Sequence, residues 1–245
     1  MKHLDLFSGI GGFSLAADFV WGKENVEHIF CEIEEFPRKV LQKHWPTSEI
    51  HNDITKLDGK TIKDVFIATG GFPCQDLSQA GHMEGFAGDR SSLYSEMLRV
   101  IGESRPEFAV FENVTNLLMG QSGRWFAKFL YDLAEIGYDA EWHCIPASAV
   151  GAAHHRDRVW IIAYPNGANV EGLHFPKSLF THTEESRRRE LTRAIDACLH
   201  PDDYAKMRSV VNDVPDQMGE LKAYGNAIVP QVAAVIMQAI KDIGG

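Results

Sequence analysis

Short apolar segments alternate with amphipathic segments along most of this chain, and this alternation most constrains its fold. The apolar segments are rich in β-branched and aromatic residues, whereas the intervening segments repeat apolar residues at helical spacing. Strands are predicted at 3–7, 26–32, 65–69, 108–112 and 158–164, and helices at 10–20, 35–44, 91–103, 123–136 and 229–243. Because strands that alternate with helices pair in parallel, we expect an α/β fold with a doubly wound, Rossmann-like sheet.

The segment 165–214 lacks this rhythm and is predicted to be a small insertion. With 245 residues, the chain has room for one large domain and such an appendage. The net charge of −10 does not exclude nucleic acid, because the segment 154–208 holds nine basic and eight acidic residues and concentrates the arginines.

Composition narrows the class of protein further. No apolar run reaches membrane-spanning length, and no signal peptide is recognised at the start, so we expect a cytoplasmic protein. The four cysteines, Cys31, Cys74, Cys144 and Cys198, form no Cys-x-x-Cys pair. A metal site or a disulfide framework is therefore not expected.

The first loop has the composition of a cofactor site. Asp-Leu-Phe-Ser-Gly-Ile-Gly-Gly at 5–12 ends a strand and opens a helix, where free N–H groups face a ligand. Glu32 ends the next strand, where an acid can bind both ribose hydroxyls, and Asp53 follows a predicted edge segment. Since the loop holds no lysine and no P-loop pattern, it favours a nucleoside cofactor without phosphates, such as S-adenosylmethionine. A plain strand-to-helix turn is the structural alternative.

Cys74 is the candidate nucleophile. It lies in Gly-Gly-Phe-Pro-Cys-Gln at 70–75, directly after an apolar strand, at the sheet edge where ligands bind in α/β folds. A free cysteine is also often a small buried apolar side chain, and this alternative stays open on the motif alone.

Two later motifs bring charged side chains to strand ends. Phe-Glu-Asn-Val at 111–114 places Glu112 after three apolar residues, where it is a helix cap, a buried ion pair or a catalytic acid. Arg156 and Arg158 precede the strand at 159–163, and in an extended chain they would point the same way. Gly225 and Asn226 open the last helix.

In this order, the motifs closely resemble those of the cytosine-C5 DNA methyltransferases. The resemblance is carried by the motifs at 5–12, 70–75 and 111–114, by Glu32 and Asp53, by Arg-Asp-Arg at 156–158 and by Gly-Asn-Ala-Ile-Val-Pro at 225–230. It covers residues 3–164 and about 210–241, and it is strongest to the compact enzymes of phages and bacteria.

The resemblance implies a methyltransferase that uses S-adenosyl-L-methionine on a flipped-out cytosine of double-stranded DNA, through a covalent bond from Cys74 to C6. Glu112 would act at N3, Arg158 at O2, Arg156 beside that carbonyl or a phosphate, and Asn113 on the surrounding loop. The implied cofactor residues are Phe7 on the adenine, Gly9, Gly11 and Gly12 near the methionine arm, Glu32 on the ribose, Asp53 on the adenine amine, and Pro73, Leu93 and Asn226 around the pocket.

The resemblance also implies a division of the chain and a set of partners. Residues 1–164 plus 215–245 would form the catalytic and cofactor-binding domain, with 165–214 as a small target-recognition region. We expect a monomer that binds DNA, without a metal or a membrane. Gln79, Ser78 or His82 would fill the gap left by the flipped base.

Two features depart from the family pattern, and other functions stay open. His154 stands where the family usually has glutamine two residues before the first arginine, and the recognition region is unusually short. The alternatives are the tRNA-methylating branch, whose Cys-Phe-Thr signature is absent, an inactive DNA-binding relative, and an enzyme with another one-carbon donor.

Overall fold

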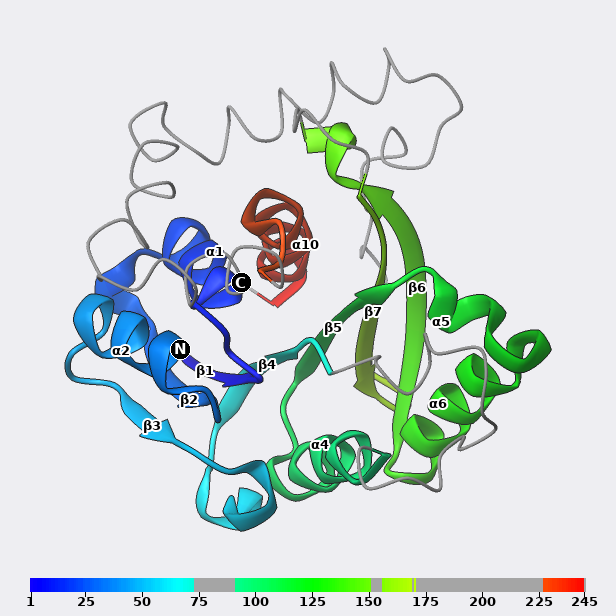
Figure 1. Ribbon diagram of the computed structural model, residues 1–245, viewed down its shortest axis with the longest axis horizontal. Helices are drawn as coiled ribbons and strands as arrows, with labels where there is room; N and C mark the ends of the chain where they lie inside the picture. The colour runs from blue at the N-terminus through cyan, green and yellow to red at the C-terminus, as the bar shows by residue number, and fades with distance from the viewer. Residues whose placement is uncertain (73–90, 151–155, 169, 171–226, 245) are drawn as a thin grey trace.

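The computed structural model describes residues 1–72, 91–150, 156–168, 170 and 227–244. In these residues, seven strands form one sheet with helices on both faces (Figure 1). The strands are β1 (Lys2–Leu6), β2 (Glu27–Cys31), β3 (Glu49–His51), β4 (Val65–Gly70), β5 (Phe108–Val114), β6 (Tyr138–Pro146) and β7 (Asp157–Pro165), in the spatial order β3-β2-β1-β4-β5-β7-β6. The predicted α/β class with a doubly wound sheet is confirmed.

Helices join most of these strands. They are α1 (Gly12–Trp21), α2 (Glu35–His44), α4 (Ser91–Ser104), α5 (Asn116–Met119), α6 (Arg124–Glu135) and α10 (Pro230–Gly244), with short 3₁₀ turns η1 (Lys23–Asn25), η2 (Ile54–Lys56), η3 (Gly59–Thr61), η4 (Gly120–Gly123) and η5 (Ala147–Val150). The bounds of α2 are those predicted. This helix ends before Trp45-Pro46, because the residue preceding a proline is driven out of the helical region.

The expectation of purely parallel pairing is wrong at one end of the sheet. Strands β3, β2, β1, β4 and β5 pair in parallel, but β7 is antiparallel to both β5 and β6. Only residues 147–156 separate β6 from β7, too few for the crossover that parallel neighbours need. Strand β6 was not predicted, although Tyr138, Ala140, Trp142 and Cys144 alternate with polar residues in its sequence.

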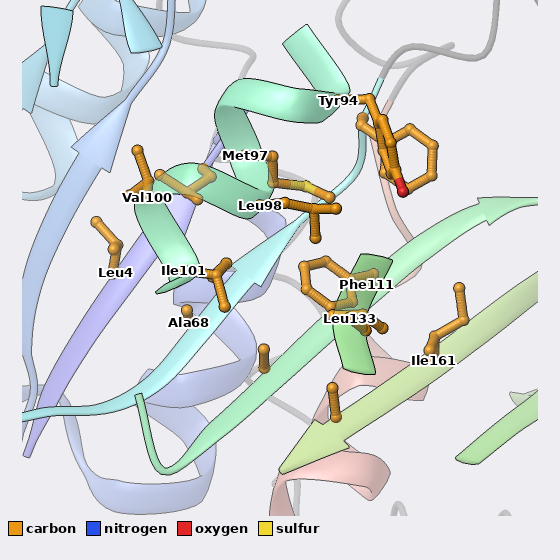
Figure 2. Packing of buried hydrophobic residues seen from close by; sticks show 14 of the residues in the cluster. Leu4, Ala68, Tyr94, Met97, Leu98, Val100, Ile101, Phe111, Leu133 and Ile161 are labelled. Atoms are coloured by element: carbon orange, nitrogen blue, oxygen red, sulfur yellow. The ribbon is translucent and has the colours of Figure 1, made fainter. Parts of the chain in front are cut away.

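Each face of the sheet packs on its own set of helices. On one face Phe108 and Val110 of β5 pack with α1 and α10, and on the other Ala109 and Phe111 pack with α4 and α6. Figure 2 shows the second face, where side chains of α4 lie over the strands that carry Ala68 and Phe111. Because β5 is buried on both faces, its sequence is an unbroken apolar run up to Glu112.

Candidate functional site

Parallel strands bring their carboxyl ends to one edge of the sheet. At this edge lie the loop after β1, Glu32 after β2, Gly71-Phe72 after β4, and the end of β5. Ligands of open α/β sheets bind outside such an edge. The fold therefore places most of the predicted site residues on one side of the molecule.

The β1–α1 loop is tied to both neighbouring strands. The Ser8 hydroxyl donates to the Asp5 carbonyl at 2.5 Å, and the Ser8 N–H donates to the Cys31 carbonyl at 3.1 Å. The Gly9 N–H donates to Glu32 Oε2 at 2.7 Å. These bonds join the loop to Glu32 before any ligand is present.

Different structural constraints apply at the three glycines of this loop. Gly9 and Gly11 both adopt positive φ, at 53° and 84°. A Cβ on Gly11 would lie 2.6 Å from the Trp45 ring, and one on Gly12 would lie 2.7 Å from Ile228 Cγ1, whereas one on Gly9 would meet nothing within 4 Å. Packing therefore explains Gly11 and Gly12, and only Gly9 borders open space.

Glu32 is a buried carboxylate at the end of β2. Besides the bond from Gly9, its Oε1 accepts the Glu34 N–H at 2.8 Å. Burial raises the pKa of Glu32, and these two N–H groups oppose that shift. Each oxygen keeps a lone pair, so the carboxylate can also accept hydroxyl groups of a ligand.

Asp53 follows β3 and is already bound by its own neighbours. Its Oδ1 accepts the N–H and the hydroxyl of Thr55 at 3.0 and 2.6 Å, and Lys56 Nζ lies 2.9 Å from Oδ2. These contacts lower the pKa of Asp53 to about 2. The carboxylate therefore caps η2, a local role that the sequence analysis did not assign to it.

The two apolar residues predicted at the cofactor pocket, Phe7 and Leu93, are partly buried. Both pack against the core on the α4 side of the sheet. Phe7 adopts φ of 55°, which is uncommon for a residue with a side chain. The chain thus turns sharply at the end of β1, directly before Gly9.

The buried Glu112 and the partly exposed Arg158 form an ion pair across two antiparallel strands. Glu112 faces Trp160 in the β5–β7 register, and Arg158 faces Val114 two residues further along β5. Arg158 Nε lies 3.1 Å from Glu112 Oε1. Burial raises the pKa of Glu112, and Arg158 and Arg156 oppose that shift. The predicted acid and both predicted arginines therefore meet, as one carboxylate–guanidinium cluster of Glu112, Arg156 and Arg158.

Arg156 reaches this cluster in a way that the sequence did not predict. It lies before β7 with φ of 32°, so it is not part of an extended run with Arg158. Its Nη2 donates to the Ala227 carbonyl at 2.7 Å. Burial and the neighbouring Arg158 lower the pKa of Arg156. This bond holds the segment before α10 beside the cluster. The next residue of that segment, Ile228, packs against Gly12.

Asn113 anchors the start of the next loop. Its amide donates to the Phe72 carbonyl at 3.2 Å, and its Oδ1 accepts the Val114 N–H at 2.8 Å. A Cβ on Gly71 would lie 3.8 Å from Glu112 Oε2, so this loop begins beside the carboxylate. These contacts join the end of β5 to the start of the loop after β4.

Several predicted residues lie outside the described part of the chain. They are Cys74, Pro73 and Asn226, the gap-filling candidates Gln79, Ser78 and His82, and the arginines of the 165–214 segment. Among the described residues, no cluster of His, Cys, Asp or Glu could hold a metal ion. No described helix is long and apolar enough to cross a membrane.

A second set of buried polar residues, which the sequence did not predict, lies beneath the β1–α1 loop. They are His3 and Asp5 of β1, Ser14 of α1, His28 of β2 and Thr69 of β4. Their signal in the sequence was a polar residue at alternate positions of an otherwise apolar strand, as in His3-Leu4-Asp5-Leu6.

Comparison with known proteins places this arrangement in a family context. The family model for C-5 cytosine-specific DNA methylase matches residues 1–222. Type II methyltransferase M1.ScrFI of Lactococcus lactis subsp. cremoris is 39% identical over 164 residues, which cover 66% of this chain and 41% of that protein. The chain spans about half the length of the curated relatives it matches.

Solved structures share the fold over nearly the whole chain. The Entamoeba histolytica methyltransferase EhMeth aligns with a TM-score of 0.69 at 15% identity, covering 99% of this chain and 98% of its own. A DNA modification methyltransferase encoded in an E. coli prophage aligns with a TM-score of 0.66 at 16% identity, covering 99% of both chains. At these identities the likeness concerns the fold alone.

Proposed function

The chain belongs to the C-5 cytosine-specific DNA methylase family, and we propose that it transfers a methyl group from S-adenosyl-L-methionine to C5 of cytosine in double-stranded DNA. The observation that carries this proposal is the cluster of Glu112, Arg156 and Arg158, which lies at the same sheet edge as Glu32 and Gly9. A proton-sharing group for a base and a binding site for a nucleoside are thereby combined in one molecule.

The β1–α1 loop fits S-adenosyl-L-methionine. Glu32 offers oxygen lone pairs to ribose hydroxyls, and Gly9 leaves open space for a close approach. The cofactor supplies an electrophilic methyl group when it is bound. Phe7, Asp53, Pro73, Leu93 and Asn226 complete the proposed site, and Gly11 and Gly12 support it by packing.

Cytosine C5 is too weak a nucleophile to accept that methyl group unaided. In the proposed reaction the Cys74 thiolate forms a bond to C6, which breaks the C5–C6 double bond and moves electron density to C5 and N3. After C5 has gained the methyl group, a base removes the C5 proton. The Cys74–C6 bond then breaks, and the double bond returns.

Glu112 is suited to share a proton with N3 during the attack. Because burial raises its pKa, the carboxyl holds a proton more readily than an exposed glutamate does. Arg158 provides hydrogen-bond donors for the cytosine O2, where charge develops during the attack. Arg156 provides donors for the same carbonyl or for a nearby phosphate. Asn113 positions the loop that leads to Cys74.

The remaining parts of the proposal concern the substrate and the division of the chain. Duplex DNA hides C6, so the cytosine must be flipped out at a cost of roughly a few kcal/mol. We propose 165–214 as the target-recognition region and 1–164 plus 215–245 as the catalytic domain, which the packing of α10 on α1 supports. We expect a monomer that acts in the cytoplasm of a bacterial or phage-infected cell.

Covalent capture tests this function. Duplex DNA of diverse sequence carrying 5-fluorocytosine should form a denaturation-stable adduct in the presence of the cofactor, because fluorine cannot leave C5 as a proton does. Cys74→Ala should form none, whereas Cys144→Ala, which changes an exposed cysteine on β6, should form as much as wild type.

The substrate is tested in the same assay. Capture of fluorinated tRNA but not of DNA would assign the chain to the RNA-methylating branch. An adduct that persists in Cys74→Ala would remove Cys74 from its role. The absence of any adduct, despite measurable cofactor binding, would favour a DNA-binding relative without activity.

A further inference from the structure

Four hydrogen bonds in series connect five buried polar side chains under α1. Asp5 Oδ1 lies 2.8 Å from Thr69 Oγ1, and Thr69 Oγ1 lies 2.8 Å from His3 Nε2. His3 Nδ1 lies 3.0 Å from His28 Nδ1, and His28 Nε2 lies 2.8 Å from Asp18 Oδ1. We call these five residues the relay.

The relay joins four elements at the base of the cofactor loop. Asp5 pairs with Thr69 in the β1–β4 register, and His3 pairs with His28 in the β1–β2 register. The Asp5 carbonyl holds Ser8 of the loop, and Thr69 precedes Gly70 at the end of β4. A change in the relay therefore acts on the cofactor loop and on the strand that leads to Cys74.

Counting protons defines the state of the relay. Each of the four bonds needs one proton, while one hydroxyl and two neutral imidazoles supply only three. A fourth proton is therefore required, and it can reside on Asp5 or, with the bonds reversed, towards the Asp18 end of the relay. The two arrangements interconvert by reversing the direction of the bonds between the two ends.

Burial favours the arrangement with the proton on Asp5. In that form only Asp18 is charged, and it also accepts the Trp45 indole N–H at 2.9 Å. In the other form Asp5 is a buried anion, and no cation contacts it among the described residues. Burial lowers the pKa of His3 well below its usual value, so His3 is neutral.

Ser14 supports the same assignment. Its hydroxyl donates to Asp5 Oδ2 at 2.8 Å, so towards His3 Nδ1, at 3.5 Å, it can only accept. A proton on His3 Nδ1 suits both Ser14 and His28. That proton is present when Asp5 is protonated, and it moves to the His28 side when Asp5 is ionised.

We propose that Asp5 is a positioning residue which, while protonated, completes the relay and holds the cofactor loop in its binding geometry. Losing this proton leaves three protons for four bonds, so that two acceptors face each other and the tie between β1 and β2 or between β2 and α1 is weakened. The cofactor-binding consequence rests on the proposed function, whereas the proton arrangement does not.

Asp5 should titrate within a pH range that binding experiments can cover. Burial raises the pKa of Asp5 to about 7, opposed by Ser14 and Thr69 and assisted by Glu32. The ionisable groups around it are His3 on its own strand, His28, Cys31 and Glu32 on and after β2, and Asp18 on α1, while β4 contributes the uncharged Thr69. A change in the charge of Glu32 would therefore also shift the pKa of Asp5.

Binding of S-adenosylhomocysteine to the full chain, measured by calorimetry between pH 6 and pH 8.5, tests the proposal. If binding requires the proton, affinity should fall roughly tenfold from pH 6 to pH 8. Asp5→Asn keeps the shape and can donate to Thr69 permanently, so its affinity should be flat over this range. Asp58→Asn, which changes an exposed cap of η3, should retain the wild-type fall. A flat wild-type profile, or an equal fall in Asp5→Asn, would overturn the proposal.

Nitrogen NMR of the two imidazoles tests the relay without any ligand. At pH 6 we expect the proton of His3 on Nδ1 and that of His28 on Nε2. Thr69→Val should abolish this pattern, and Thr69→Ser should keep it. If both imidazoles carry their proton on Nε2 in the wild type, the relay is wrong. If the tautomers are as expected but no cofactor analogue binds at any pH, the proposed function fails and the loop-holding role of Asp5 falls with it.

Discussion

Asp5 and Glu112 are buried carboxyl groups at two places in the same sheet, and their partners differ in kind. Among the described residues, the two oxygens of Asp5 contact the neutral hydroxyls of Ser14 and Thr69, within the parallel part of the sheet. Glu112 lies against Arg158, with Arg156 near by, where β7 runs antiparallel to β5.

The difference shows how the partners of a buried carboxyl group determine which protonation state is favoured. Neutral donors compensate burial only in part, so Asp5 is suited to hold a proton and to tie strands together. Guanidinium groups stabilise the carboxylate form of Glu112 and oppose the effect of burial, so Glu112 is suited to exchange a proton with a bound base. We therefore expect changes at Asp5 to act on stability and cofactor binding, and changes at Glu112 to act on turnover.

The largest effect is expected from Glu112→Gln. The amide keeps the shape but cannot share the same proton with a base, so turnover should fall by roughly 10²–10⁴-fold. Binding of S-adenosylhomocysteine should be unchanged, as titration calorimetry would show. A weakened cofactor with normal turnover would reverse the roles assigned to the two regions.

The pH dependence of stability should separate the two carboxyls. The pKa of Asp5 is raised from 3.8 to about 7 in the fold. The folded state thus holds a proton that the unfolded state releases, and this contribution, present below pH 3.8, is lost as pH rises to 7. The loss amounts to at most about 4 kcal/mol. Thermal unfolding at pH 5 and 8 should show Asp5→Asn losing less stability than wild type over this interval, whereas Glu112→Gln keeps the Asp5 contribution. Parallel profiles of Asp5→Asn and wild type would contradict the comparison.

Glycine substitutions test whether the cofactor loop is held by packing. Gly11→Ala combines positive φ with a Cβ 2.6 Å from Trp45, so it should destabilise the fold by roughly 2–4 kcal/mol. Gly9→Ala meets open space and should cost only about 1–2 kcal/mol. Urea unfolding measures both values. Equal losses would mean that the backbone strain, and not the contact with Trp45, decides the first.

The smallest effect is expected at Glu32. Glu32→Gln replaces an oxygen that accepts hydroxyls or N–H groups by an amide, and should weaken cofactor binding by roughly 10- to 100-fold. Turnover at saturating cofactor should stay near that of wild type. Glu34→Gln, at an exposed position two residues along the chain, is the matched control. A turnover loss as large as that of Glu112→Gln would place Glu32 in the chemistry.

The sequence predicted the parallel part of the sheet well and the antiparallel part poorly. The bounds of α2 were correct, because the helix is delimited by signals in its own sequence, such as Trp45-Pro46 at its end. Strand β6 was missed, although its alternation of apolar and polar residues was visible. The relay was missed because its members lie on four separate elements.

By itself, the sequence determined the family, the alternation of strands and helices, and which residue types carry the chemistry. Only the tertiary structure decided that Gly11 and Gly12 serve packing, that Asp53 caps a turn, and that Arg156 lies near Glu112 in a left-handed turn while binding Ala227. The physical reason is the distance along the chain over which each effect acts. Periodicity and turn chemistry act between neighbours in the chain, whereas the pKa of a buried carboxyl depends on which distant strands pack against it.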